Sequence, residues 1–233
     1  MTIIETNLQT VHQRIARACQ AAGRVPAEVT LLAVSKTVAA AAVLDAYGFG
    51  QTAFGENYIQ EGLEKINQLR ALPIQWHCIG PIQSNKTRLV AEHFDWVHTV
   101  ERFKTAQRLS QQRPANLPPL QVCIQVNVDG GGAKSGVLPQ DALVLARQVV
   151  ALPRLQLRGI MSIPEPAPDF AAACALFARV KAVFDALNAA GLALDTLSMG
   201  MSADLEAAIH CGSTLVRVGS AIFGERPVKA VVL

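Results

Sequence analysis

The sequence is poor in charged and aromatic side chains. Charged residues make up 17% and aromatic residues 5% of its 233 residues, and the formal net charge is only +3. No run of lysine and arginine and no stripe of basic and aromatic side chains is present, so a nucleic-acid-binding face is not expected. Hydrophobic residues account for 51% of the chain, which is typical of a globular protein and not of a disordered one.

Paired cysteines and membrane signals are also missing. The five cysteines are odd in number and none belongs to a C-x-x-C pair, so neither a disulfide framework nor a zinc site is predicted. Residues 1–7 lack the basic start and apolar stretch of a secretory signal peptide, and no uncharged apolar run is long enough to cross a membrane. We therefore expect a cytoplasmic protein with free thiols and no metal, nucleic-acid or membrane partner.

Short apolar runs alternate with helical patterns along the whole chain. The apolar runs predict strands at residues 29–34, 51–54, 75–79, 96–100, 120–128, 155–161, 194–199 and 214–218. The helical patterns lie at residues 3–22, 38–47, 57–70, 84–93, 102–112, 139–151, 169–190 and 203–211. The longest internal helix has Asp169 as its expected N-cap and Gly191 just beyond its end.

This order of elements indicates an α/β fold. Eight strands, each but the last followed by a helix, imply a parallel sheet, and about 230 residues suit a closed (β/α)₈ barrel of the TIM type with one extra N-terminal helix. The alternative is a doubly wound open sheet, which usually has fewer strands and a glycine-rich first turn that this sequence lacks. No linker or low-complexity tract is visible, so residues 1–233 are expected to form a single domain.

A lysine follows the first apolar run, in the segment V-T-L-L-A-V-S-K-T at residues 29–37. Active sites of such barrels gather at the carboxyl ends of the strands, where Lys36 is expected. Burial disfavours the ammonium form and lowers the pKa of a lysine, and the neutral amine can form a Schiff base with a carbonyl compound. From this segment alone, a lysine that reaches from the strand end into solvent is the alternative.

Small polar residues follow the last two strands. Gly200 and Ser202 come after the seventh strand, and Gly219 and Ser220 after the eighth, which carries Arg217. Loops at these two places often bind phosphate through backbone N–H groups, although serine and glycine are also common in ordinary caps and turns. The two loops and the arginine together predict a phosphate site. With a reactive lysine at the same rim, they favour a phosphorylated aldehyde such as pyridoxal 5′-phosphate.

Six motifs strengthen this interpretation. In chain order they are L-A-V-S-K-T, F-G-E-N-Y, W-H-C-I-G-P-I-Q-S-N-K, K-S-G, S-M-G-M-S-A-D and R-V-G-S-A-I-F-G. They resemble the motifs of the pyridoxal phosphate homeostasis proteins, which are single-domain relatives of the alanine racemase N-terminal barrel, the fold type III barrel of pyridoxal phosphate proteins. The resemblance runs from the N-terminal helix to Gly224 and is specific as a combination rather than motif by motif.

The resemblance implies a set of cofactor contacts. Lys36 would carry pyridoxal 5′-phosphate as a Schiff base, Ser202, Gly219 and Ser220 would contact its phosphate, and Arg217 its pyridine nitrogen. An arginine there would keep the nitrogen unprotonated and weaken the ring as an electron sink. Position 220 is serine where many relatives have threonine, which retains the hydroxyl. The ring pocket would be lined by Asn57, Met161, Ser162 and Ser198.

The expected function is intracellular pyridoxal phosphate homeostasis: buffering or carrying the cofactor and supplying it to apo-enzymes through transient contacts, without robust catalysis. The first alternative is a weak amino-acid racemase, which needs a base on each face of the substrate. In alanine racemases a tyrosine of a second, β-rich domain supplies one of these bases, and residues up to 233 contain no such domain. Tyr47 and Tyr58 are expected in helices, and His77 and His98 as packing residues. A monomer is expected, because the swapped domain is lost.

Two further interpretations carry less weight. A Schiff-base aldolase without cofactor would also use a barrel lysine and a phosphate site, but it needs an acid/base pair near Lys36 that the sequence does not offer. The segment G-G-G-A-K-S at residues 130–135 superficially resembles a phosphate-binding P-loop, but Val128 and Ala133 replace the required glycines. We expect a mobile loop there, with Lys134 as a solvated charge rather than a second aldehyde site. Lys86 is expected to cap a helix.

Overall fold

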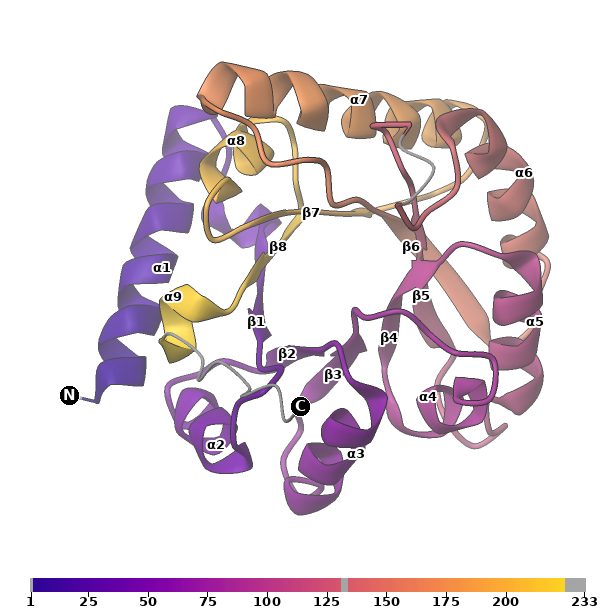
Figure 1. The fold of residues 1–233 in the computed structure, drawn as a ribbon, viewed down its shortest axis with the longest axis horizontal. Helices are drawn as coiled ribbons and strands as arrows, with labels where there is room; N and C mark the ends of the chain where they lie inside the picture. Colours follow the sequence, from indigo (N-terminus) through magenta and orange to yellow (C-terminus); the bar gives the residue numbers. More distant parts are fainter. Residues whose placement is uncertain (1, 131–133, 225–233) are drawn as a thin grey trace, which may run out of the picture.

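Eight parallel strands close into a barrel in the computed structural model, which describes residues 2–130 and 134–224. Neighbouring strands in sequence pair with one another, and β1 closes the ring by pairing with β8 through Thr30–Leu215 to Ala33–Val218. Figure 1 shows the ring of strands with the helices outside it. The strands are β1 (Thr30–Val34), β2 (Ala53–Glu56), β3 (Gln75–Cys78), β4 (Trp96–Val100), β5 (Leu120–Gln125), β6 (Leu155–Met161), β7 (Thr196–Met201) and β8 (Leu215–Val218).

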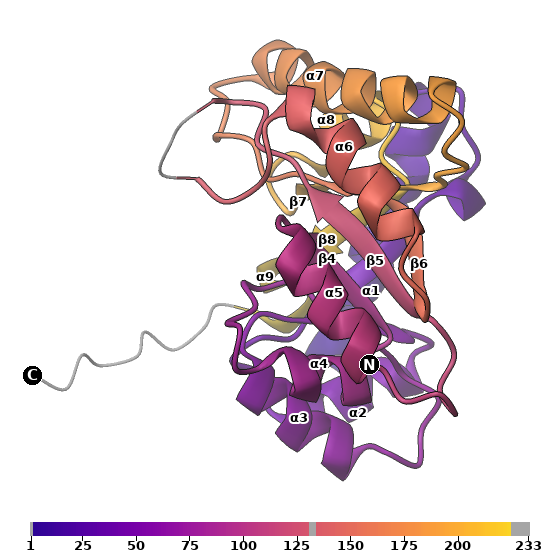
Figure 2. The same ribbon diagram turned by 90° about the vertical axis from the view of Figure 1, so that its right-hand side faces the viewer.

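A helix follows each strand, and one more helix precedes the first. Figure 2 shows α5 and α6 packed on the outside of the barrel in front of β5. The helices are α1 (Ile3–Ala21), α2 (Ala40–Gly48), α3 (Ile59–Gln68), α4 (Thr87–His93), α5 (Phe103–Gln112), α6 (Pro139–Val150), α7 (Phe170–Ala189), α8 (Leu205–His210) and α9 (Ser220–Phe223), with a 3₁₀ turn at Pro26–Glu28. The predicted (β/α)₈ barrel with an extra N-terminal helix is therefore confirmed.

Side-chain caps and apolar faces fix the two longest helices. The Thr2 hydroxyl accepts a hydrogen bond from the Glu5 backbone N–H at the start of α1, and the Asp169 carboxylate accepts one from Ala172 at the start of α7. The expected cap at Asp169 is thus confirmed. The buried faces of the two helices pack on the barrel through Leu8, Val11, Ile15, Ala18 and Cys19 in α1 and Ala173, Phe177, Val180 and Leu187 in α7.

The apolar core has an outer layer and a filled interior. The main cluster lies between the strands and the helices, where alternate strand residues meet the apolar faces of the helices. Two smaller clusters fill the inside of the barrel: Leu32, Val34, Ala53, Ile79 and Leu215 in one, and Trp96, Cys123 and Met161 in the other. The barrel centre is consequently a packed core and not a channel.

Several predicted boundaries are wrong by two or three residues. The strand expected at 51–54 is Ala53–Glu56, so Glu56 belongs to β2 and only Asn57 follows it. The strand expected at 120–128 ends at Gln125, and the one expected at 194–199 runs from Thr196 to Met201. Tyr58 precedes α3 in extended conformation instead of lying in a helix. For the three strands, the apolar run in the sequence does not show where the ladder of strand hydrogen bonds begins or ends.

The last strand is also followed by a helix, which was not predicted. Helix α9 spans only four residues, Ser220–Phe223, and is too short to produce a helical period in the sequence. Within residues 2–130 and 134–224, no helix has the length and apolar character needed to cross a membrane. In the same described part of the chain, no group of three or more His, Cys, Asp or Glu side chains is arranged to hold a metal ion.

Candidate functional site

A cavity of about 300 Å³ opens at the carboxyl ends of the strands. Its volume lies at the lower end of the range for small-molecule sites, about 300–1,000 Å³. The lining comes from the segments that follow β1, β2, β3, β6, β7 and β8, as expected for a barrel of this type. The lining residues are Val34, Lys36, Asn57, Ile79, Ile163, Met201, Ser202, Ala203, Arg217, Gly219 and Ser220.

Lys36 lies at this cavity, two residues beyond the end of β1, and its side chain is half-buried. The backbone on both sides of it is held from α3. Lys65 Nζ donates a hydrogen bond of 2.6 Å to the Ser35 backbone oxygen, and the Thr37 backbone N–H donates to the Glu61 carboxylate. Thr37 has a φ of 63°, a conformation uncommon for a non-glycine residue. The segment that carries Lys36 is therefore fixed by side chains of a neighbouring helix.

A buried ion pair lies behind Lys36. Lys65 Nζ is 2.7 Å from Glu56 Oε1, which also accepts a 2.6 Å hydrogen bond from the Ser35 hydroxyl. Both charged side chains are almost completely buried. Burial raises the pKa of the Glu56 carboxyl, and the attraction of Lys65 only partly opposes this. Such a pair is costly to break, because removing one partner leaves the other charge buried alone.

Asn57 reaches the cavity from the end of β2. Its backbone oxygen lies where the loop after β3 passes very closely: a Cβ atom on Gly80 would be 2.1 Å from it, so only glycine fits at position 80. The Asn57 side-chain Oδ1 is buried, and no hydrogen-bond partner for it exists among the described residues. A buried acceptor without a partner is costly, which favours a ligand donor at this position of the cavity.

Ser202 lies in the turn after β7. Gly200 has a φ of +92°, and a Cβ atom there would be 2.4 Å from the Ala208 Cβ of α8, so glycine allows this turn to pack against the helix. The Asp204 carboxylate accepts a 2.6 Å hydrogen bond from the Met201 backbone N–H. From α1, Arg14 donates a 2.9 Å bond to the Ser202 backbone oxygen and pairs with Glu206 at 2.8 Å. The N-terminal helix thus holds the turn.

Gly219 and Ser220 form the start of α9 at the other side of the cavity. The first N–H groups of a helix have no partner within the helix, and they favour an anion. Asn7 of α1 donates a 2.9 Å hydrogen bond to the Ile222 backbone oxygen and so holds α9 in place. Both phosphate-binding segments predicted from the sequence are therefore supported by the same helix, α1.

Arg217 lies at the base of the cavity and is only 4% exposed. Its guanidinium donates to the Ser198 backbone oxygen at 2.9 Å, to the Ser198 hydroxyl at 2.7 Å and to the Ser162 backbone oxygen at 3.0 Å. In residues 2–130 and 134–224, no carboxylate lies within ion-pair distance of it. Burial lowers its pKa to about 10. A buried cation held by neutral oxygens favours an acceptor on its open side.

Six of the nine residues expected to bind the cofactor line the cavity: Lys36, Asn57, Ser202, Arg217, Gly219 and Ser220. The other three, Met161, Ser162 and Ser198, are fully buried and lie outside the lining. Ser162 and Ser198 contact Arg217, and Met161 pairs with Ser198 in the sheet. These three residues therefore lie beneath the cavity, where Ser162 and Ser198 accept hydrogen bonds from Arg217.

The remaining candidates from the sequence lie elsewhere. Lys134 forms ion pairs with Asp129 at 2.7 Å and Glu165 at 2.8 Å, so it is not a purely solvated charge. Lys86 occupies the N-cap position of α4, but its side chain forms no capping hydrogen bond, and its amine lies 3.3 Å from Gln60 Oε1. The mobile loop predicted around Lys134 includes residues 131–133, which lie outside the described part of the chain.

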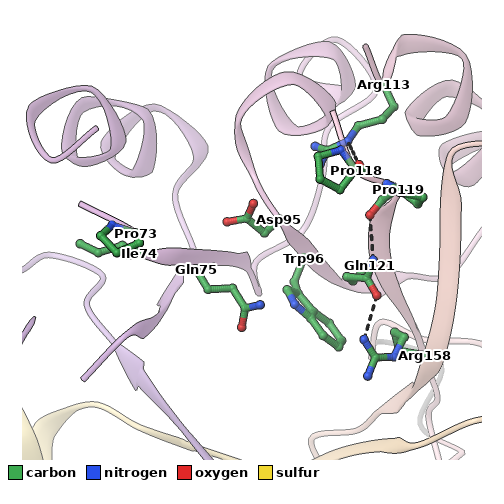
Figure 3. Close-up of a pocket in the computed structure, with 10 residues that line it drawn as sticks. All are labelled: Pro73, Ile74, Gln75, Asp95, Trp96, Arg113, Pro118, Pro119, Gln121 and Arg158. Atoms are coloured by element: carbon green, nitrogen blue, oxygen red, sulfur yellow. Dashed lines mark hydrogen bonds between the residues drawn. The ribbon is translucent and has the colours of Figure 1, made fainter. Parts of the chain in front are cut away.

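A larger cavity of about 450 Å³ lies at the opposite end of the barrel (Figure 3). Its polar side chains are already hydrogen-bonded within the protein: Arg113 donates to the Pro118 backbone oxygen, Gln121 to the Pro119 backbone oxygen, and Arg158 to the Gln121 side chain. Among its lining residues in the described part of the chain, there is no lysine, serine, threonine or cysteine that could act as a nucleophile. Although it is larger, this cavity offers no comparable chemistry, and the candidate site is the one that contains Lys36.

Several residues that shape the site were not predicted from the sequence. Asn7 and Arg14 support the two phosphate-binding segments, and Lys65 supports the segment of Lys36. No local pattern identifies them, because each acts across at least thirty positions of the chain. Lys65 lies on a helix with several other polar side chains, so the sequence of α3 does not single it out.

Comparisons with known proteins agree with this geometry. The family model described as alanine racemase, N-terminal domain, matches residues 6–227. The pyridoxal phosphate homeostasis protein of Pseudomonas aeruginosa is 59% identical over 226 residues, covering 97% of both chains. That of Vibrio cholerae is 53% identical over 230 residues, covering 97% of this chain and 98% of the relative.

Solved structures of other proteins have a similar fold. PipY of Synechococcus elongatus, in a structure with pyridoxal phosphate bound, has a TM-score of 0.79 and 38% identity, covering 92% of this chain and 100% of PipY. An alanine racemase of Clostridium difficile has a TM-score of 0.74 at 15% identity, covering 97% of this chain and 57% of the racemase. At that identity, the racemase supports the fold alone.

Proposed function

This chain belongs to the pyridoxal phosphate homeostasis proteins, a family built on the alanine racemase N-terminal domain, and from this premise we propose that it binds pyridoxal 5′-phosphate as a Schiff base on Lys36. The observation that carries the proposal is the convergence of Lys36, Arg217 and the segments of Ser202 and Ser220 on one cavity of about 300 Å³. The bound group would supply an aldehyde, a phosphate and an aromatic nitrogen acceptor, for which these residues offer an amine, N–H and hydroxyl donors, and a guanidinium.

The two segments at the carboxyl ends of β7 and β8 would hold the phosphate. The hydroxyls of Ser202 and Ser220 and the N–H groups at the start of α9 are donors, and Gly219 lets the backbone approach closely. An anion placed there would gain from several donors at once. Arg14 and Asn7 would act indirectly, by holding these segments in place from α1.

Arg217 would donate to the pyridine nitrogen. It is always a donor and never an acceptor, so it can bond only to an unprotonated ring nitrogen. An unprotonated nitrogen makes the ring a weaker electron sink, which supports a protein that holds the cofactor over one that drives its chemistry. Asn57, whose Oδ1 lacks a partner in the described structure, would complete the ring pocket.

We favour homeostasis over racemase activity, because no second base is among the cavity-lining residues in the described part of the chain. Tyr58 is 54% exposed and lies outside the lining, and Tyr47 packs against the core from α2. His77 and His98 are buried and hydrogen-bonded to each other, 2.9 Å apart. The relatives are named for homeostasis, which supports a role in buffering pyridoxal 5′-phosphate and supplying it to apo-enzymes. A weak racemase-type activity is the second candidate, because Lys36 would supply one of the two bases.

A cytoplasmic location and a monomeric state complete the proposal. All five cysteines are free thiols, and Cys19, Cys78 and Cys123 are buried, which suits a reducing compartment. The apo-enzymes that receive the cofactor would be transient partners at the open rim of the barrel.

The proposal is tested with the purified protein and two assays. First, pyridoxal 5′-phosphate is titrated against the wild type and K36M while the absorbance of the bound cofactor is followed; only the wild type should give saturable binding. Second, the loaded protein is incubated with L-alanine, and separately with a pyridoxal phosphate-dependent apo-enzyme. The proposal expects no sustained formation of D-alanine and a recovery of the apo-enzyme's activity. Sustained racemisation would favour the second candidate, and equal binding by K36M would refute the assignment of Lys36.

A further inference from the structure

A chain of hydrogen bonds crosses the inside of the barrel from Arg217 to the opposite end. Arg217 Nη1 on β8 donates to Ser198 Oγ on β7 at 2.7 Å, and this hydroxyl lies 3.0 Å from His98 Nδ1 on β4. His98 Nε2 lies 2.9 Å from His77 Nδ1 on β3, and His77 Nε2 lies 3.0 Å from Gln75 Oε1. The chain thus joins four strands of the barrel through side chains alone.

The arginine fixes the direction of this chain. A guanidinium is a donor only, so Ser198 Oγ must accept from it, and the only other partner of the hydroxyl among the described residues is His98. The hydroxyl therefore donates to His98 Nδ1. His98 must then carry its proton on Nε2 and donate to His77 Nδ1, and His77 must carry its proton on Nε2 and donate to Gln75.

The opposite direction leaves a buried donor unsatisfied. If His98 Nδ1 donated to Ser198, the hydroxyl hydrogen would have no acceptor in the described structure, although Ser198 is completely buried. A buried hydroxyl without a hydrogen-bond partner is energetically costly. The direction away from Arg217 satisfies every group, so both histidines are expected to be Nε2–H tautomers.

Both rings are held neutral. His98 and His77 are 0% and 1% exposed, and the His77 ring stacks on Trp96 with centroids 5.2 Å apart. Burial lowers the pKa of His77 to about 3, and burial with the nearby His77 and Arg217 lowers the pKa of His98 well below its ordinary value. A neutral His98 can accept from Ser198, whereas an imidazolium could not accept and would repel the arginine.

We propose that His98, supported by His77, is a positioning residue for Arg217. By accepting the Ser198 hydroxyl proton in a hydrogen bond, His98 turns the lone pairs of Ser198 Oγ toward the guanidinium. Oriented neutral dipoles then stabilise the buried cation in place of a carboxylate and hold it at the base of the cavity. This inference rests on the proposed function only for its consequence, the placement of Arg217 against pyridoxal 5′-phosphate; the tautomers exist without the cofactor.

The tautomers are tested first, on the cofactor-free protein labelled with ¹⁵N-histidine. A two-bond ¹H–¹⁵N correlation spectrum at pH 7 distinguishes the two neutral tautomers and the imidazolium, and variants H77Q and H98N assign the two rings. Both rings should be neutral Nε2–H tautomers. An Nδ1–H tautomer or an imidazolium at either ring would overturn the proposal, whether or not the protein binds pyridoxal 5′-phosphate.

The positioning role is tested with four proteins loaded with pyridoxal 5′-phosphate: wild type, H98L, H98N and H12L. H98L removes the acceptor, whereas H98N returns an acceptor to the Nδ1 position. H12L is the matched control, because His12 is exposed on α1. H98L should bind about tenfold more weakly with a shifted absorption maximum, and H98N should recover most of the affinity and the maximum. Equal affinity and equal spectra for H98L and H12L would refute the positioning role.

Discussion

Lys65 Nζ lies 2.6 Å from the backbone oxygen of Ser35, the residue directly before Lys36. The same amine pairs with Glu56 and Glu61, and the Glu61 carboxylate accepts from the Thr37 backbone N–H directly after Lys36. The buried Lys65, together with its partner Glu61, therefore holds the backbone on both sides of Lys36. Lys36 owes its position at the mouth of the barrel to this network as well as to the end of β1.

Replacing Lys65 should damage the fold before it affects any chemistry. K65M leaves the Glu56 charge buried without its partner and should lower the free energy of unfolding by about 3–5 kcal/mol. The double variant E56Q/K65M removes both charges and should recover a large part of this loss. Urea unfolding measures both. K181M breaks an exposed pair with Asp185 and should cost less than about 1 kcal/mol. Equal losses for K65M and K181M would contradict this account.

Glycine at position 200 should be indispensable for space as well as for backbone conformation. Both Gly200 and Gly191 have φ near +90°, but only at Gly200 would a Cβ atom meet another atom, the Ala208 Cβ at 2.4 Å. G200A should therefore destabilise the protein by about 2–4 kcal/mol and G191A by about 1 kcal/mol. Thermal unfolding compares the two. G200A/A208G should regain part of the difference, and equal effects of G200A and G191A would show that the contact is unimportant.

The N-terminal helix should influence phosphate binding from a distance. R14M removes the hydrogen bond to the Ser202 backbone oxygen and the pair with Glu206. Because the bond is partly exposed, we expect about threefold to tenfold weaker binding of pyridoxal 5′-phosphate. Binding of pyridoxal, which lacks the phosphate, should be unchanged. R17M, an exposed arginine on the same helix, is the control. A loss of pyridoxal binding that equals the loss for the phosphate form would contradict the assigned role.

Stability should fall in mild acid because of the buried histidines. The pKa of His77 is lowered to about 3, whereas the unfolded chain has a value near 6.5. Below pH 6.5 the unfolded state therefore binds more protons, and the free energy of unfolding should drop by about 2 kcal/mol from His77 alone between pH 7 and pH 5. Urea unfolding at both pH values should show a smaller drop in H77Q than in H12Q. Equal drops in these two variants would refute the prediction.

Much of the architecture could be predicted from the sequence, because the spacing of apolar residues indicates which segments form strands and which form helices. Eight apolar runs separated by helical patterns indicate the barrel, and the barrel rule alone brings Lys36 and Ser220 to one rim although they are far apart in the chain. The pairing of His77 with His98 could not be predicted in this way. It depends on which side chains of β3 and β4 point inward at the same level, and this follows from strand register.

Some errors have a local cause. Helix α9 is too short to show a period, and the segment F-G-E-N gave no signal for where β2 ends. The sequence therefore does not show that Glu56 belongs to β2 or that it pairs with Lys65. The three expected ring-pocket residues beneath the cavity, Met161, Ser162 and Ser198, illustrate the same limit: a sequence motif indicates that residues lie near a site, but not whether they face it or support it.

The most direct test of the central claim is chemical mapping of the bound cofactor. The protein is loaded with pyridoxal 5′-phosphate, reduced with borohydride and digested, and the peptides are examined by mass spectrometry. Lysines 36, 65, 86 and 134 are compared in one experiment. The account predicts a pyridoxyl adduct on Lys36, and its loss in K36M. An adduct located solely on another lysine, or no adduct at all, would contradict it.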